Sequence, residues 1–267
     1  MARTRGTWNT PTMWLAGSSL VSVLALTGYV IFGGDESGPG APAKGGQVVS
    51  AAPFGGTSPV PTYAAPEEWT EPERWVALPR GQRTDQYGSE VGFPHSTEGA
   101  AAMMKAASTT TIEADRSTVD EQLRIYRSFI GKTDHSAQNA QRIEANAASA
   151  DETLAREMKV SPGQPLPPGA YVRSHVVGYQ VVQRSGDEVS AYVLARVTQK
   201  TGETAKESAT YTRSLLGVQW QDGDWKLTSA ASMRAKQMSQ GKPKPKMGAP
   251  GDIAFNEAGW TAIREAS

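Results

Sequence analysis

The chain has 267 residues, and its 27 Lys and Arg are balanced by 27 Asp and Glu. This neutral balance lacks the basic excess that nucleic-acid binding requires, so no direct nucleic-acid contact is expected. The absence of cysteine excludes disulfides, thiolate catalysis and cysteine-ligated metal. The three histidines, His95, His135 and His175, lie far apart and show no metal-ligand spacing, so neither a metal nor a cofactor is expected.

The N-terminal region predicts a membrane anchor. Residues 1–12 carry two arginines, and residues 13–32 form an uncharged, mostly apolar stretch. A helix of that length, at about 1.5 Å per residue, spans the roughly 30 Å hydrocarbon core of a bilayer. Asp35 and Glu36 follow the stretch. Because the basic flank stays in the cytoplasm, we expect a single-pass protein of the cell membrane with its C-terminal bulk outside the cytoplasm.

A cleaved signal peptide is the alternative interpretation of this region. Ala41-Pro42-Ala43 has the small-x-small form of a cleavage site. However, the apolar part of a signal peptide usually has only about 7–15 residues and lies close to its cleavage site. Here the apolar run is longer, and two acidic residues stand between it and Ala43. These features favour an anchor.

Residues 33–90 are rich in Pro, Gly and Ala and contain few large apolar side chains, so a disordered linker is expected. One part departs from this composition, because residues 67–79 contain both Trp69 and Trp75. Exposed tryptophans are unfavourable in a free tether. This strip is therefore predicted to pack either on the folded domain or on a partner.

Three helices are predicted in the first half of the folded domain, residues 91–236. Ser96 is a favourable N-cap for a first helix that contains the Ala-rich run 100–107. Residues 118–121 resemble a capping box at the start of a second helix, which Gly131 ends. A third helix is expected from about 133 to 158.

The second half of the domain changes to the period-two pattern of strands. Strands are predicted at 171–184, 189–199, 208–220 and 225–228, with the last two joined by an Asp222-Gly223 hairpin turn. The expected fold class is therefore α+β, with three helices packed on a curved four-stranded antiparallel sheet.

The closing hairpin carries a family resemblance. Residues 220–227 read W-x-D-G-x-W-x-L, which, after an Ala-rich opening helix and three long strands, resembles the NTF2-like superfamily. That resemblance implies a cone formed by helices and sheet. An anchor, a stalk and a single such domain also resemble the VirB8/TcpC-like conjugation-channel components. High Ala, Gly and Pro usage without cysteine suits an actinobacterial cell surface.

The resemblance also says where chemistry would lie, since NTF2-like enzymes use an acid or a His–Asp pair inside the cone. The candidates for such a role are Asp115, Tyr126, Tyr171, His175, Tyr179 and Arg213. His175 with Asp115 would be the acid–base couple. Mid-strand alternation favours a half-exposed His175 on the polar face of the sheet, beside Tyr171 and Tyr179, so no catalytic residue is expected.

The C-terminal residues 237–267 are predicted to form a flexible tail that ends in a short docking helix, capped by Asn256, with Trp260 and Ile263 on one face. A basic, Pro-alternated spacer precedes an apolar strip that contains Phe255, Trp260 and Ile263. Such a strip docks on its own domain or on another protein, and the sequence leaves both possibilities open. The candidate partner-binding residues are Trp69, Trp75, Phe255, Trp260 and Ile263.

The predicted function is that of an extracytoplasmic scaffold in a conjugation or secretion-type apparatus. Its expected partners are the membrane, other subunits of a membrane complex and further copies of this chain. One alternative is a membrane-tethered NTF2-like domain that binds or transforms a small molecule, and another is a cell-wall or surface protein whose domain binds a partner. The interior of the cone separates them: a deep pocket with His175 or Asp115 inside favours an enzyme, whereas an interior filled by Met103, Met104, Tyr126 and Trp side chains favours a scaffold.

Overall fold

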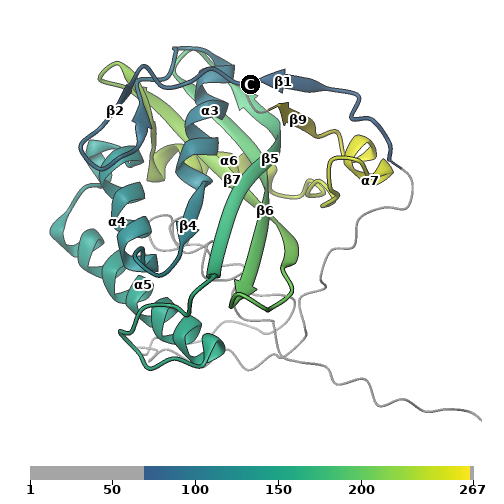
Figure 1. Ribbon diagram of the computed structural model, residues 1–267. Coiled ribbons are helices and arrows are strands. Elements are labelled where there is room, and N and C mark those ends of the chain that lie inside the picture. The colour runs from purple at the N-terminus through teal and green to yellow at the C-terminus, as the bar shows by residue number, and fades with distance from the viewer. Residues whose placement is uncertain (1–68, 265–267) are drawn as a thin grey trace, which may run out of the picture.

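The structure, a computed structural model, describes residues 69–264 (Figure 1). The predicted membrane anchor at 13–32 and most of the predicted linker lie outside these residues. Within the described part, no helix has the length and apolar character needed to cross a bilayer. The described fold begins before the expected boundary at residue 91, because residues 69–90 already carry strands.

A mixed sheet of seven strands forms the centre of the fold. Its order is β1-β9-β5-β6-β7-β8, and β4 pairs with β5 beside this path. The strands are β1 (Trp75–Ala77), β4 (Thr110–Ile112), β5 (Ala170–Arg184), β6 (Glu188–Thr201), β7 (Ser208–Gln221), β8 (Asp224–Leu227) and β9 (Thr261–Arg264). All pairs are antiparallel except β1 with β9, which is parallel. A separate two-stranded hairpin joins β2 (Arg83–Thr84) to β3 (Glu90–Val91).

The expected cone of three helices on a four-stranded antiparallel sheet is therefore wrong. The four strands predicted from alternation are present as β5 to β8, but three short strands extend the sheet at the β5 edge. Strands of three or four residues carry too little period-two signal to be recognised. Their pairing also joins segments that are nearly 190 residues apart, such as Trp75 opposite Ala262.

Within residues 69–264, five α-helices pack around the sheet rather than the three predicted. They are α3 (Thr97–Ser108), α4 (Thr118–Phe129), α5 (Ala137–Met158), α6 (Ser229–Ser239) and α7 (Ile253–Glu257). Figure 1 shows α3 crossing the sheet, with α4 and α5 packed side by side next to it. On the opposite face α6 lies against β7, where a Cβ on Gly217 would come within 2.4 Å of the Ala231 backbone.

The start of α4 differs from the prediction by one residue. The N-cap is Ser117, whose hydroxyl accepts a hydrogen bond from the Asp120 amide, and Asp120 in turn accepts from the Ser117 amide. This is the capping box that the sequence placed on Thr118 and Glu121. The shift releases Glu121 from a capping role, and its side chain turns into the protein instead.

The C-terminal strip forms the core on the second face of the sheet. Phe255 and Trp260 are 0% and 1% exposed, and they pack with Tyr192 and Leu194 of β6. The Trp260 indole donates a 2.8 Å hydrogen bond to the backbone oxygen of Lys246. Residues expected in a flexible tail therefore form α7, which covers the sheet, and β9, which belongs to it. The predicted helix that carries Trp260 and Ile263 is wrong, because α7 ends at Glu257 and Ile263 lies in a strand.

The tryptophan strip docks on this same C-terminal segment. The Thr70 amide donates to the Gly251 oxygen, and Asn256 of α7 makes reciprocal bonds to the backbones of Glu71 and Glu73. The Ala262 amide donates to the Arg74 oxygen at the start of the β1–β9 ladder. Of the two predicted docking places, the structure shows the chain's own domain.

Phe255→Ala should lower the free energy of unfolding by about 3–5 kcal/mol, because it opens a cavity in a closed core. The matched control is Ile253→Ala, two residues earlier in α7 and 63% exposed, which should cost less than about 1 kcal/mol. Urea denaturation of the full chain measures both. Equal, small losses for the two variants would show that the strip is not part of the core.

Candidate functional site

The space between the helices and the sheet is filled by side chains. Met103, Met104 and Phe129 are 0% exposed, and Tyr126 and Trp225 are buried with them. Their packing places the largest apolar volumes where the resemblance implies a pocket. The interior between the helices and the sheet is therefore a filled apolar core at these residues.

The two residues of the imagined acid–base couple lie in different surroundings. Asp115 is exposed in the turn between β4 and α4. His175 lies on the face of β5 that points away from α3, because Ser174 and Val176 on either side of it are buried under the helices. A bulge between Val176 and Gly178 then reverses the alternation, so that Tyr179 faces the helices. The prediction that Tyr179 lies on the same side of the sheet as His175 is therefore wrong.

The other four candidates have structural partners. The Tyr126 hydroxyl accepts from the Ser136 amide and donates to the Ser136 oxygen, at 2.8 and 3.0 Å. Tyr171 donates to the Glu207 carboxylate, and this hydrogen bond raises the pKa of Tyr171. Arg213 donates to the Pro245 oxygen. Burial raises the pKa of Tyr179, which lies in the core.

A cleft of about 600 Å³ opens elsewhere, at the side of the helical layer. Its walls come from the segment that follows β1, the β2–β3 hairpin, the end of α3, the start of β4, the first turns of α4 and the last residue of β9. Phe93, Ala102 and Phe129 supply apolar surface, but most of the lining residues are polar or charged. Neither His175 nor Asp115 lines it.

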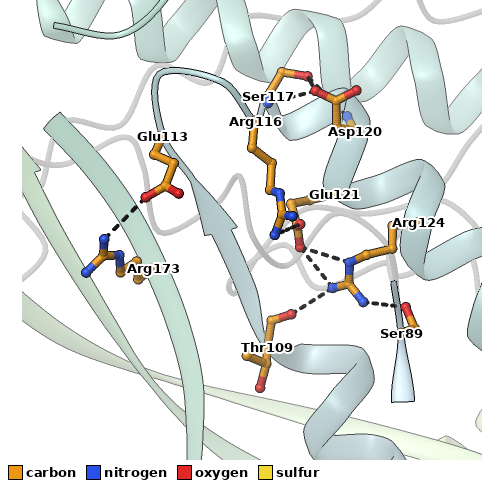
Figure 2. Close-up of polar contacts among 9 residues, drawn as sticks. All are labelled: Ser89, Thr109, Glu113, Arg116, Ser117, Asp120, Glu121, Arg124 and Arg173. Atoms are coloured by element: carbon orange, nitrogen blue, oxygen red, sulfur yellow. Dashed lines mark hydrogen bonds and ion pairs between the residues drawn. The ribbon is translucent and has the colours of Figure 1, made fainter. Parts of the chain in front are cut away.

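A buried carboxylate organises one wall of this cleft (Figure 2). Glu121 is 2% exposed and accepts from Nε and Nη2 of Arg124, at 3.3 and 2.9 Å. Nη1 of Arg116 lies 3.3 Å from its other oxygen. Arg124 also donates to the Ser89 hydroxyl and the Thr109 oxygen, each at 2.9 Å. One guanidinium thus ties α4 to the β2–β3 hairpin and to the end of α3.

The charged residues of the lining are predominantly basic. The lining contains two carboxylates, Glu90 and Glu121, and five cationic side chains. A cleft lined mainly by one sign of charge concentrates the opposite charge from solution. The five cations are Arg80, Lys105, Arg116, Arg124 and Arg264.

The β2–β3 turn that carries part of the cleft wall is held by Asp85. Its Oδ1 accepts from the amides of Tyr87 and Ser89, both at 2.9 Å. Burial raises the pKa of the Asp85 carboxyl, but these backbone hydrogen bonds, together with the Ser128 side chain and the charge of Lys226, outweigh burial and hold the pKa below its ordinary value of 3.8. This β-turn also positions the Ser89 hydroxyl, which accepts a hydrogen bond from Arg124.

The five candidate partner-binding residues divide by burial. Phe255, Trp260 and Ile263 lie in the core, at 0%, 1% and 9% exposed, so their side chains are occupied by this domain. Trp75 is half-buried, with Arg264 stacked 5.0 Å from its ring. Trp69 is 62% exposed; one part of its ring lies against Gly251, and its indole N–H donates to the Glu71 carboxylate at 3.2 Å.

The Glu121 cluster had no equivalent in the sequence analysis. Glu121 and Arg124, three apart on a helix, have the spacing of an ordinary surface ion pair, and Glu121 had been assigned to the cap. The available signal was Ser117, which with Asp120 fits a capping box equally well. With the capping box at Ser117 and Asp120, Glu121 has no capping role, and its side chain can be buried against the protein.

Comparison with protein-family models, with curated proteins and with solved structures found no match. The resemblance to VirB8/TcpC-like components stays a proposal based on the residues themselves.

Glu121→Ala should destabilise the full chain by about 3 kcal/mol, because it leaves the mostly buried Arg124, 16% exposed, without its carboxylate. Arg116→Ala serves as the control, since this side chain is 53% exposed and its loss should cost less than about 1 kcal/mol. Denaturant titration measures both. Equal losses would mean that Glu121 contributes only as a surface group.

Asp85→Asn should lower stability at neutral pH by up to about 1 kcal/mol, because it removes the charge that strengthens two backbone hydrogen bonds. The folded-state pKa lies below 3.8, so this stabilisation is complete above that value and is lost as the pH falls through the folded-state pKa. Unfolding titrations at pH 7 and pH 3 should show the difference between the proteins shrinking at pH 3. A difference independent of pH would contradict this role for the charge.

Proposed function

We propose that the chain is a membrane-anchored, extracytoplasmic scaffold in a conjugation or secretion-type apparatus and acts through protein–protein contacts. The observation that carries this proposal is the filled interior, where Met103, Met104 and Phe129 are 0% exposed. NTF2-like enzymes and ligand-binding proteins of the kind implied by the resemblance work inside that space. A domain whose interior is packed solid offers its outer surface instead.

The closing hairpin supports the resemblance on which the proposal draws. Trp220 of β7 lies opposite Trp225 of β8, as the W-x-D-G-x-W spacing implies. Asp222 and Gly223 both adopt positive φ, 52° and 81°, which a type I′ turn requires. Trp225 then donates from its indole to the Pro94 oxygen and fixes the entry to α3.

The proposed arrangement follows from the segments of the chain. The uncharged stretch 13–32 would hold the protein in the bilayer, and the linker would let the domain reach subunits away from the membrane surface. Trp69, at the start of the described fold, would then stand at the domain's tethered end as an exposed aromatic contact. Aromatic side chains are enriched among residues that dominate protein interfaces.

Site-specific photo-cross-linking in the native cell tests this function. A photoreactive residue in place of Trp69 should capture other subunits of a membrane complex, such as a transfer ATPase or channel protein. Met233 on α6, 55% exposed, provides a comparison position at similar exposure. Recovery of uncross-linked chain only, together with unchanged transfer or secretion after deletion of the gene, would contradict the proposal.

The anchor has its own test, because the scaffold role depends on tethering. The full-length chain should remain with membranes after alkaline carbonate extraction, and external protease should digest its C-terminal domain. A released mature form that begins near Lys44 would show that the N-terminal stretch is a signal peptide.

A further inference from the structure

Residues 233–251, which run from α6 to the turn before α7, carry cations and no carboxylate. One of the cations, Arg234, is paired with Glu188 of β6. Lys236, Lys242 and Lys246 are exposed and form no ion pair within residues 69–264. In a chain whose charges balance, this stretch is a local excess of positive charge. The charged side chains of the stretch are Arg234, Lys236, Lys242, Lys244 and Lys246.

Helix α6 carries the first part of this stretch. Ala231 and Ala235 are 0% exposed and pack the helix against the sheet, mainly on β7. Met233 and Lys236 are three residues apart and lie on the opposite side of the helix, where Met233 is 55% exposed. An apolar and a cationic side chain therefore share the outer surface of α6.

The segment that follows α6 lies on the same face of the sheet. Arg213 stands four residues before Gly217, over which α6 packs, so the two residues point to the same side of β7. The Arg213 guanidinium donates to the Pro245 oxygen, and the Trp260 indole donates to the Lys246 oxygen at 2.8 Å. These bonds hold the backbone against the sheet while the Lys246 side chain stays exposed.

Cations and apolar side chains thus lie together on the outside of this layer. Met247 directly follows Lys246 and is 51% exposed. Membrane-surface proteins combine the same two features, because cations attract anionic headgroups and apolar side chains enter the boundary of the acyl chains. We call the following exposed residues the Lys–Met surface: Met233, Lys236, Lys242, Lys246 and Met247.

The proposed anchor would keep a bilayer within reach of this surface. Residues 33–68 separate the uncharged stretch 13–32 from Trp69. A coil of this length would have an end-to-end distance on the order of 30 Å. The domain would therefore meet the bilayer at a high effective concentration, and a weak intrinsic affinity for lipid would be sufficient for binding.

We propose that the Lys–Met surface binds the anionic phospholipid headgroups of the membrane that carries the chain. Binding would turn the second face of the sheet toward the bilayer and would leave α3, α4 and α5, on the other face, open to other subunits. The inference rests on the proposed membrane-anchored function, to which it adds a second contact between the chain and the bilayer.

Single-cysteine labelling tests the proposal, because the chain has no cysteine of its own. Met233→Cys and Met247→Cys each receive a dye whose emission shifts to the blue in an apolar environment. Tyr87→Cys, on the β2–β3 turn and 39% exposed, is the control. The full chain is reconstituted into vesicles of phosphatidylcholine, either alone or mixed equally with phosphatidylglycerol.

The dyes at positions 233 and 247 should shift in the anionic vesicles only, and high salt should abolish the shift, since exposed charges are screened. The dye at position 87 should not respond. Unchanged emission at 233 and 247 in the anionic vesicles would overturn the proposal. So would the same shift in phosphatidylcholine alone, or an equal shift at position 87.

Two sets of glutamine substitutions separate the surface from net charge. A lysine near an anionic membrane contributes roughly fivefold to affinity, so loss of all three surface lysines should weaken binding about a hundredfold and remove the dye shift. The same change at three exposed lysines elsewhere should leave the shift intact. Equal effects of the two sets would contradict the assignment. The surface set is Lys236→Gln, Lys242→Gln and Lys246→Gln, and the matched set is Lys132→Gln, Lys159→Gln and Lys206→Gln.

Flotation of the vesicles and a comparison with native membranes separate the remaining outcomes. A dye shift in membranes that retain their proteins, but not in anionic lipid, would assign the Lys–Met surface to a protein partner and overturn the lipid assignment. Flotation of the chain with both kinds of vesicle but without any dye shift would sink this inference alone. Failure to float with either kind would remove the proposed anchor and this inference with it.

Discussion

The insertion of β9 between β1 and β5 is the constraint on which the rest of the described structure depends. It joins the end of the chain to the tryptophan strip through a parallel ladder, Trp75–Ala262 to Ala77–Arg264. The same segment brings Phe255 and Trp260 onto the second face of the sheet, where both are buried. Pairing with β9 also fixes the position of β1, and therefore of the cleft wall that follows β1. Arg264, the last residue of β9, lines the same cleft, so its position depends on this pairing as well.

With both faces of the sheet covered, the domain has little interior to devote to chemistry. The helix-side core is filled by methionine and aromatic side chains, and the polar cluster around Glu121 is used to join three elements rather than to face a pocket in the core. Outside this core, Trp69 is exposed and the cleft beside α4 has a predominantly basic lining.

The sequence predicted the regular parts of this fold well and the long-range parts poorly. Alternation and turn chemistry located β5 to β8, because long strands and an Asp-Gly turn are encoded locally. The extra strands could not be seen, since β1 and β9 have three and four residues and each gains its conformation from the other. The cleft was missed for a related reason. A one-residue change in the capping frame decides whether Glu121 points to solvent or into the protein, and only the packed structure resolves it.

Hydrogen exchange of the full chain, followed by mass spectrometry, tests the role of β9 most directly. Amides in peptides covering Thr261–Arg264 and Trp75–Ala77 should be protected together, and they should open in one cooperative step at a free energy close to that of β5, because the two strands pair with each other and β9 also pairs with β5. Rapid exchange of the β9 amides under conditions in which β5 stays protected would mean that the C-terminal segment is a loosely attached tail. That result would contradict the account in which the C-terminal segment covers the second face of the sheet and fixes the wall of the cleft.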